Sequence, residues 1–233
     1  MEIIPVIDLL DGIVVHAKRG DRHRYQAIES CLSNSSEPDS IIDGYFTLFP
    51  FKNIYIADLN AIQGNSHHLN YLETLVTRFP ECIFWVDAGL TLIKEITELQ
   101  QTNNIRLIIG TENDPSKEIF KSLHKNKTDW VLSLDFLSPN TEVNSSIMVS
   151  DIYWPKDIIT MMLYRVGTEN GIDEKQLQQL KPFLSKHQIY VAGGIANKIE
   201  LTRLKEQGIH GALIATALHN GTLSKQELQS IMS

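Results

Sequence analysis

The stretches WVDAGLTLIKEITELQ (85–100) and YVAGGIANKIELTRLK (190–205) decide the fold, because they repeat one pattern along the chain. The same shift of 105 residues aligns the next strand end, IIGT (108–111), with LIAT (213–216) without a gap. Two successive strand ends in register indicate two fused half-repeats. The identical pairs include Val86/Val191, Gly89/Gly194, Glu95/Glu200, Thr97/Thr202, Leu99/Leu204, Ile109/Ile214 and Thr111/Thr216.

Eight short apolar runs, mostly continuous, predict strands buried on both faces. Between most of them, apolar residues recur at helical spacing. Eight alternating units in 233 residues predict one closed (β/α)₈ barrel, with half-barrels of about 1–110 and 111–233. An open doubly wound sheet is disfavoured, because no glycine fingerprint follows the first strand. The predicted strands are 2–8, 53–58, 82–87, 106–110, 130–135, 159–165, 188–192 and 211–215. The helical stripes are Leu69, Leu72, Leu75 and Val76; Leu92, Ile93, Ile96 and Leu99; and Leu201 and Leu204.

Composition narrows the classes of partner. The chain is 42% hydrophobic and 21% charged, as in an ordinary globular protein, and its net charge of −7 disfavours a nucleic-acid partner. Cys31 and Cys82 lie far apart without a CxxC motif, which predicts no disulfide framework and no zinc site. No run of 18 apolar residues or signal peptide is evident, so we expect no membrane association and a cytoplasmic location.

Aspartates close two opposite strands of the predicted barrel. Asp8 ends the first strand and Asp135 the fifth, on the rim where (β/α)₈ barrels build their active sites. Two carboxyl groups across one pocket can divide proton abstraction and proton donation, although each can instead cap a loop or helix. Asp58 and Asp87 also end strands, but without His or Glu in a ligand pattern, so we predict no metal and no cofactor. No lysine closes a strand, which argues against imine chemistry.

Small residues at strand ends form a second candidate set. They offer backbone N–H groups where barrels frequently bind phosphate, and two such places on opposite rims would suit a ligand phosphorylated at both ends. The alternative is that the glycines serve only tight turns. The residues are Gly193, Gly194, Ala215 and Thr216 on one rim, and Gly89, Gly110 and Thr111 on the other.

A basic segment, HAKRGDRHRY (16–25), lies in a long polar loop predicted for 16–37. It is either a solvated surface or a cover that closes over a phosphate, with arginine giving bidentate contacts. Residues 136–158 form a second long loop on the same rim, and the pair His67-His68 is expected to be ordinary surface. The candidate ligand contacts here are His16, Arg19, Arg22 and Arg24, with Tyr164 and Arg165 at the end of the sixth strand.

IIPVIDLLDGIVVHAKRGD (3–21), VAGGI (191–195) and the repeat resemble the histidine-biosynthesis barrels, the isomerase HisA and the cyclase HisF, over the whole chain. The resemblance implies an Amadori rearrangement of a doubly phosphorylated aminoaldose, with its two aspartates at Asp8 and Asp135. It also implies phosphate contacts at Gly193-Gly194 and Ala215-Thr216 on one side, and at Gly89 and Gly110-Thr111 on the other.

Several positions depart from that family pattern. The family's GGG after the third strand is Asp87-Ala88-Gly89 here, so a carboxylate lies where the second phosphate is expected. The arginine that follows this motif in the isomerase is Thr91, and the basic residue after VV is His16. The isomerase's TDISRDGT is replaced by YRVGTENG (164–171). Half of the recognition set thus differs while the acid/base pair is retained.

The leading prediction is an isomerase of a phosphorylated sugar or aminosugar, with Asp8 as general base and Asp135 as general acid. The loop pattern GxRxxY (Gly20, Arg22, Tyr25) resembles that of related barrels in organisms with methanopterin-type cofactors. That resemblance implies an alternative, a cyclase or lyase in methanopterin or methanofuran biosynthesis. A third alternative is a non-catalytic barrel that binds a small phosphorylated metabolite. The chain could also form a homo-oligomer or be a subunit of an enzyme complex.

Overall fold

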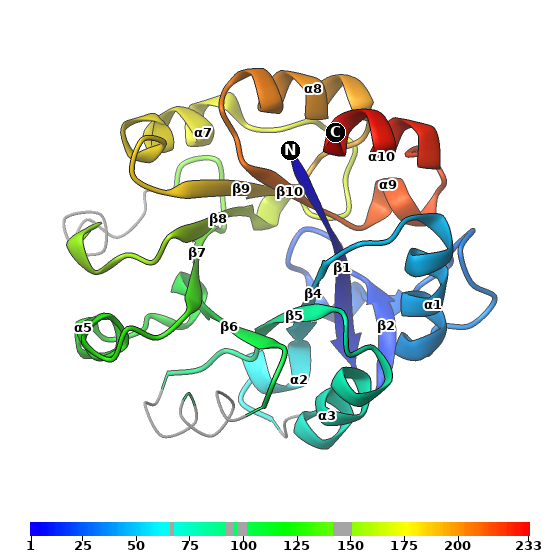
Figure 1. Cartoon of the computed structure of the whole chain (residues 1–233), viewed down its shortest axis with the longest axis horizontal. Coiled ribbons are helices and arrows are strands. Elements are labelled where there is room, and N and C mark those ends of the chain that lie inside the picture. The colour runs from blue at the N-terminus through cyan, green and yellow to red at the C-terminus, as the bar shows by residue number, and fades with distance from the viewer. Residues whose placement is uncertain (66–67, 92–95, 97–101, 142–150) are drawn as a thin grey trace.

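The computed structural model describes residues 1–65, 68–91, 96, 102–141 and 151–233. Within them, eight parallel strands form a ring in chain order, and the pairing of the last strand with the first closes it (Figure 1). The predicted (β/α)₈ barrel is therefore confirmed. The barrel strands are β1 (Glu2–Leu10), β4 (Asn53–Asp58), β5 (Ile83–Asp87), β6 (Ile105–Gly110), β7 (Trp130–Phe136), β8 (Asp157–Met162), β9 (Gln188–Ala192) and β10 (Gly211–Ile214).

The sixth barrel strand ends earlier than its sequence predicts. The run 159–165 was expected to be extended throughout, but β8 ends at Met162, and Leu163–Arg165 form the 3-10 helix η4. The Val166 N–H donates to the Leu163 carbonyl, so the chain bonds to itself and leaves the strand ladder. The predicted strand was therefore too long at its carboxyl end. In the structure, Tyr164 and Arg165 lie in a turn.

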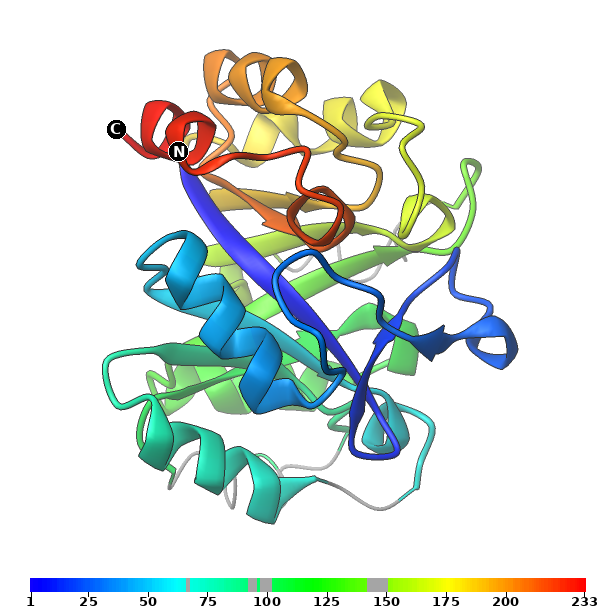
Figure 2. The same cartoon turned by 90° about the vertical axis from the view of Figure 1, so that its right-hand side faces the viewer.

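A hairpin extends the first strand beyond the barrel. β1 pairs antiparallel with β2 (Ile13–His16), and the connecting Asp11 and Gly12 both have positive φ, as a two-residue type I′ turn requires. β3 (Gln26–Ala27) pairs with β2, and the 3-10 helix η1 (Arg22–Arg24) lies between them. The long polar loop predicted for 16–37 therefore contains a short strand and a 3-10 helix. Figure 2 shows this ribbon projecting beside the barrel.

Helices surround the strands and pack on their outer faces (Figure 1). The predicted stripes are confirmed at Leu72 and Leu75, which are buried in α3, and at Leu201 and Leu204, which are buried in α8. Leu92, Ile93 and Leu99, like His67, lie outside the described residues. The outer helices are α1 (Pro38–Leu48), α3 (Leu69–Arg78), α5 (Lys117–Lys125), α7 (Glu174–Leu180), α8 (Lys198–Glu206) and α10 (Lys225–Met232). The shorter helices are α2 (Leu59–Ile62), α9 (Thr216–His219), η2 (Thr111–Asn113), η3 (Asp151–Tyr153) and η5 (Lys181–Phe183).

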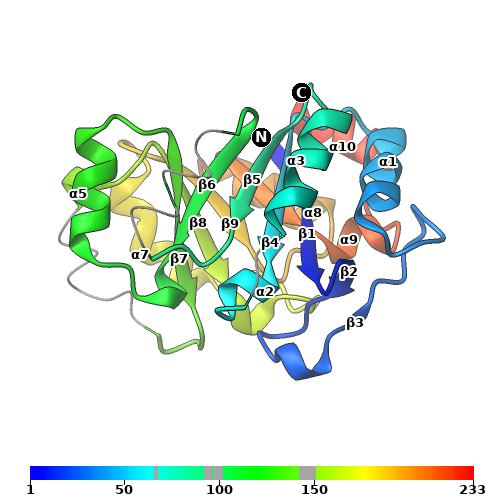
Figure 3. The same cartoon turned by 90° about the horizontal axis from the view of Figure 1, so that it is seen from below.

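A second core fills the barrel interior, separate from the core under the helices. Trp85 and Tyr190, which the repeat matches to each other, meet there edge to face with ring centroids 5.0 Å apart. In Figure 3 the strands run toward the side that carries α2, β2 and β3, while both chain termini lie at the opposite end. The inward side chains at the carboxyl ends of the strands are therefore free to build a site. None of the described helices is long and apolar enough to cross a membrane.

Candidate active site

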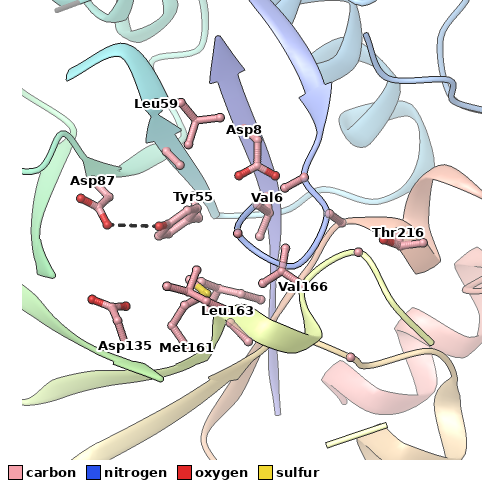
Figure 4. Close-up of a pocket in the computed structure, with 18 of the residues that line it drawn as sticks. Val6, Asp8, Tyr55, Leu59, Asp87, Asp135, Met161, Leu163, Val166 and Thr216 are labelled. Carbon is pink, nitrogen blue, oxygen red and sulfur yellow. Dashed lines mark hydrogen bonds between the residues drawn. The ribbon is translucent and has the colours of Figure 1, made fainter. Parts of the chain in front are cut away.

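A cavity opens at the carboxyl ends of the strands. Figure 4 shows Asp87 and Asp135 on one side of it and Thr216 on the other, with Asp8 and apolar side chains between them. Strand alternation explains this arrangement, because Asp8 follows Val6 by two residues on the inward face of β1. The predicted site residues that line the cavity are Asp8, Arg22, Asp135, Gly194, Ala215 and Thr216.

Asp135, near the end of β7, is held by a set of hydrogen bonds. The Ser133 hydroxyl donates to Oδ1 over 2.6 Å, and the Glu112 N–H donates to Oδ2 over 2.9 Å. The Asp135 N–H donates to Thr111 Oγ1 over 2.8 Å, which ties β7 to the turn after β6. Burial, followed by repulsion from Asp87, raises the pKa of Asp135 to about 7. The carboxyl group is thus fixed in place and able to hold a proton near neutral pH.

Asp8 has a similar affinity for protons in a different setting. Burial raises its pKa to about 7, and the positive charge of Arg22 acts in the opposite direction. None of the described residues donates a hydrogen bond to its carboxylate, in contrast to Asp135. An ionised Asp8 therefore has free lone pairs facing the cavity, as a general base requires.

Two residues that the sequence did not single out as ligand contacts complete the carboxyl-rich side. Tyr55, inward-facing on β4, donates its hydroxyl proton to Asp87 Oδ2 over 3.4 Å. Gly89 N–H donates to Asp87 Oδ1 over 3.1 Å, and burial raises the pKa of Asp87 to about 6. Glu112 reaches the cavity from η2. The side chain of Tyr55 is placed by the register of β4, which is buried on both faces, and that of Glu112 by a turn, so neither position has a local signal in the sequence.

The basic loop contributes one arginine to the cavity. Arg22 Nη2 lies 2.5 Å from Glu112 Oε1, an ion pair that joins η1 to the turn after β6 across the mouth of the barrel. Arg19 and Arg24 are exposed and do not line the cavity. His16 lines a smaller adjoining cavity together with Asp8, and its buried Nε2 has no hydrogen-bond partner among the described residues.

The candidate glycines are fixed mainly by the fold. A Cβ at Gly193 would lie 2.5 Å from the Met162 carbonyl oxygen, and one at Gly194 would lie 2.4 Å from that of Gly171. Both glycines have positive φ, and so does Gly89, where a Cβ would meet Ile62 Cα at 2.7 Å. Backbone packing therefore accounts for these three glycines without a ligand. Gly193, Gly89, Gly110 and Thr111 border the strand ends but do not line the cavity.

Tyr164 and Arg165 are turned to their own loop. Arg165 Nη1 donates to the carbonyls of Asn170 and Gly171, and Nη2 lies 3.3 Å from Asp173 Oδ2. The Tyr164 hydroxyl donates to the same carboxylate oxygen over 2.8 Å. The structure thus keeps these two side chains away from the cavity and uses them to hold the segment after η4.

Asp58, the remaining strand-end aspartate, stabilises local structure. Its carboxylate is fully buried and accepts from the N–H groups of Ala61 and His68 and lies 2.9 Å from His68 Nδ1. It therefore caps α2 and fixes the start of α3. Within the described ranges, no three His, Cys, Asp or Glu side chains are grouped as metal ligands.

Comparison with known proteins identifies the family of the chain. The family of histidine biosynthesis proteins matches residues 2–224. An uncharacterized protein of Methanocaldococcus jannaschii is 33% identical, over 98% of this chain and 97% of that protein. Isomerases named for an imidazole-4-carboxamide with two phosphoribosyl groups, from Methanopyrus kandleri and Bacillus cereus, are 25% and 24% identical. These matches cover 99% of this chain and 97% and 98% of the isomerases. The chain belongs to the histidine biosynthesis protein family.

Proposed function

We propose that this protein is an isomerase of the HisA type that converts a phosphorylated aminoaldose into the corresponding aminoketose. One observation carries the proposal: Asp8 and Asp135, from β1 and β7, line one cavity, and burial raises the pKa of each to about 7. A pKa near the working pH gives both protonation states useful populations, as general acid and base catalysis needs. The isomerases among the relatives add support.

The chemistry needs one acid and one base. In the proposed reaction, protonated Asp135 gives its proton to the ring oxygen of the aminoaldose, the ring opens, and C1 becomes an iminium carbon. Ionised Asp8 then removes the proton from C2, which gives an enaminol. Tautomerisation of the enaminol produces the 2-ketone and leaves the amine on C1. Burial and the neighbouring Asp87 favour the protonated form of Asp135, and the hydrogen bonds from Ser133 and Glu112 fix the position of its carboxyl group. The unbonded carboxylate of Asp8 suits a base.

We propose that the phosphate of the ligand lies on the β9–β10 side of the cavity. The lining there is small and uncharged, with Ala192, Gly194, Ala215 and Thr216, and the Thr216 hydroxyl has no partner among the described residues. These residues leave room for an anion to approach the backbone, and no carboxylate opposes it. The substrate is therefore held with its phosphate away from the acidic side.

The test is the pair of variants Asp8→Asn and Asp135→Asn. Isomerisation of a panel of phosphorylated aminoaldoses would be followed by NMR, together with exchange of the C2 proton in deuterated water. Positioned acid and base groups typically contribute about 10²- to 10⁴-fold, so each variant is expected to lose at least about 100-fold in kcat. Asp11→Asn, an exposed aspartate in the turn between β1 and β2, is the control. Near-full turnover by either active-site variant would contradict the assignment.

The carboxylate of Asp87 favours a second candidate, a cyclase or lyase on a different phosphorylated metabolite. The names of the isomerase relatives specify a compound with two phosphoribosyl groups. The negative charge of Asp87, beside Asp135, is unfavourable for binding a second phosphate there. Complementation of a histidine auxotroph that lacks the isomerase separates the two candidates. Growth supports the isomerase on the histidine-pathway substrate, and failure to grow with a well-folded protein favours the second candidate. Calorimetric binding without any product would instead indicate a binding protein.

A further inference from the structure

We infer that the cavity selects a ligand with one phosphate and, at the opposite end, a protonated amine, and that Asp87 determines this selection. The inference rests on the proposed function, because it takes the β9–β10 side as the phosphate side. It adds the chemical class of the other end of the substrate.

The charges of the lining are the first observation. Four carboxyl groups line the cavity, from Asp8, Asp87, Glu112 and Asp135. Among the described lining residues Arg22 is the one basic side chain, and its guanidinium is already paired with Glu112. Arg22 also acts on Asp8 and Asp87, so a single cation faces four carboxyl groups and cannot balance all of them when they are ionised. A ligand that brings a positive charge would remove this imbalance, whereas a second phosphate would increase it.

The second observation is that two of these carboxyl groups lie close together. At Gly110, a Cβ would lie 3.0 Å from Asp135 Oδ2 and 3.4 Å from Asp87 Oδ2. The two oxygens therefore both lie against Gly110, at the carboxyl end of β6. An ammonium group has three N–H donors and no acceptor, so one such group on the cavity side of these oxygens could donate to both. The Tyr55 hydroxyl donates to the same Asp87 oxygen and fixes the position of this carboxylate.

The arrangement has two separate sides. Figure 4 shows Asp87, Tyr55 and Asp135 together, and Thr216 across the cavity from them. Apolar side chains, including Met161, Leu163 and Val166, line the space between. A substrate with a charged group at each end and a less polar middle would match this order. The charge on Asp87 then decides which ligands are accepted, because it lies where a second phosphate would have to bind.

Three probes test the inference by calorimetry on the full chain at pH 7.5: pentyl phosphate, 5-aminopentyl phosphate and pentane-1,5-diyl bisphosphate. The wild type is expected to bind the amino compound at least about tenfold more tightly than the bisphosphate. Asp87→Asn is expected to reduce that preference at least about fivefold. Glu81→Gln, an exposed residue before the same strand, removes an equal charge outside the cavity and is expected to change nothing.

A pH series on the wild type gives a test that needs no variant. Affinity for 5-aminopentyl phosphate is expected to rise between pH 5.5 and 8, as Asp87 and its neighbours ionise, relative to pentyl phosphate. The inference would be overturned if the bisphosphate bound as tightly as 5-aminopentyl phosphate or more tightly. It would also be overturned if Asp87→Asn kept the wild-type preference. In both cases the proposed function would stand if pentyl phosphate binds. Binding of none of the three probes would overturn the inference, while turnover by Asp8→Asn and Asp135→Asn would still decide the proposed function.

Discussion

The two edges of the cavity share one repeated backbone pattern and carry different chemistry. The repeat matches Asp87, at the end of β5, with Ala192, at the end of β9, and Gly110 with Ala215. On the first edge, the carboxylates of Asp87 and Asp135 converge, while the second edge has small uncharged side chains. Gly89 and Gly194 both adopt positive φ and pack against backbone. The shared glycines are therefore required by the fold. Asp87 has no counterpart on the second edge, and we propose that it determines what the site binds.

The largest effect on phosphate binding is expected from placing a carboxylate on the β9–β10 edge of the cavity. Ala192→Asp would place a carboxylate at the position that the repeat matches with Asp87. Because like charges repel strongly in a partly buried site, affinity for pentyl phosphate is expected to fall by at least about 100-fold in calorimetry. Ala192→Asn, similar in size but uncharged, is the control for packing, and thermal unfolding checks that both variants fold. Wild-type affinity in Ala192→Asp would show that phosphate does not bind on this edge.

Removing the charge from the acidic edge is expected to stabilise the protein at high pH. Burial raises the pKa of Asp87 from 3.8 to about 6, so the folded chain binds this proton more tightly than the unfolded chain. Ionisation of Asp87 thus lowers stability as the pH rises from about 4 to 6. Above pH 7, Asp87→Asn is expected to raise the free energy of unfolding by at most about 3 kcal/mol, with little gain at pH 4. Urea unfolding at both pH values measures this, and a less stable variant at pH 8 would contradict it.

The smallest effect concerns the ion pair at the cavity mouth. Arg22 lowers the pKa of Asp8, so Arg22→Gln is expected to raise that pKa further, by roughly half a unit to one unit. At pH 7 this would reduce the ionised fraction of Asp8 about two- to fivefold, and kcat/KM with it. Arg24→Gln, on the same loop but exposed and outside the cavity, is the matched control. An unchanged titration of Asp8 would show that Arg22 serves only to hold Glu112.

The sequence allowed the barrel to be predicted because strand and helix periodicities are local. Asp8 and Asp135 could be proposed because barrel sites form at strand ends. Tyr55 was missed because it lies inside a strand, where only the register shows which face it occupies. Arg165 was expected at the site, but its guanidinium is bonded to the Gly171 carbonyl, a contact set by how the loop folds back. Charge contacts across separate loops, such as Arg22 with Glu112, have no local signal in the sequence.

The opposed carboxyl groups of the cavity are expected to exchange protons near neutral pH. This proton exchange is tested most directly by NMR titration of the carboxyl carbons in protein labelled with ¹³C-aspartate. The variants Asp8→Asn, Asp87→Asn and Asp135→Asn assign the signals. Signals of Asp8 and Asp135 are expected to titrate near pH 7 and that of Asp87 near pH 6. Titration of all three below pH 5 would contradict the account.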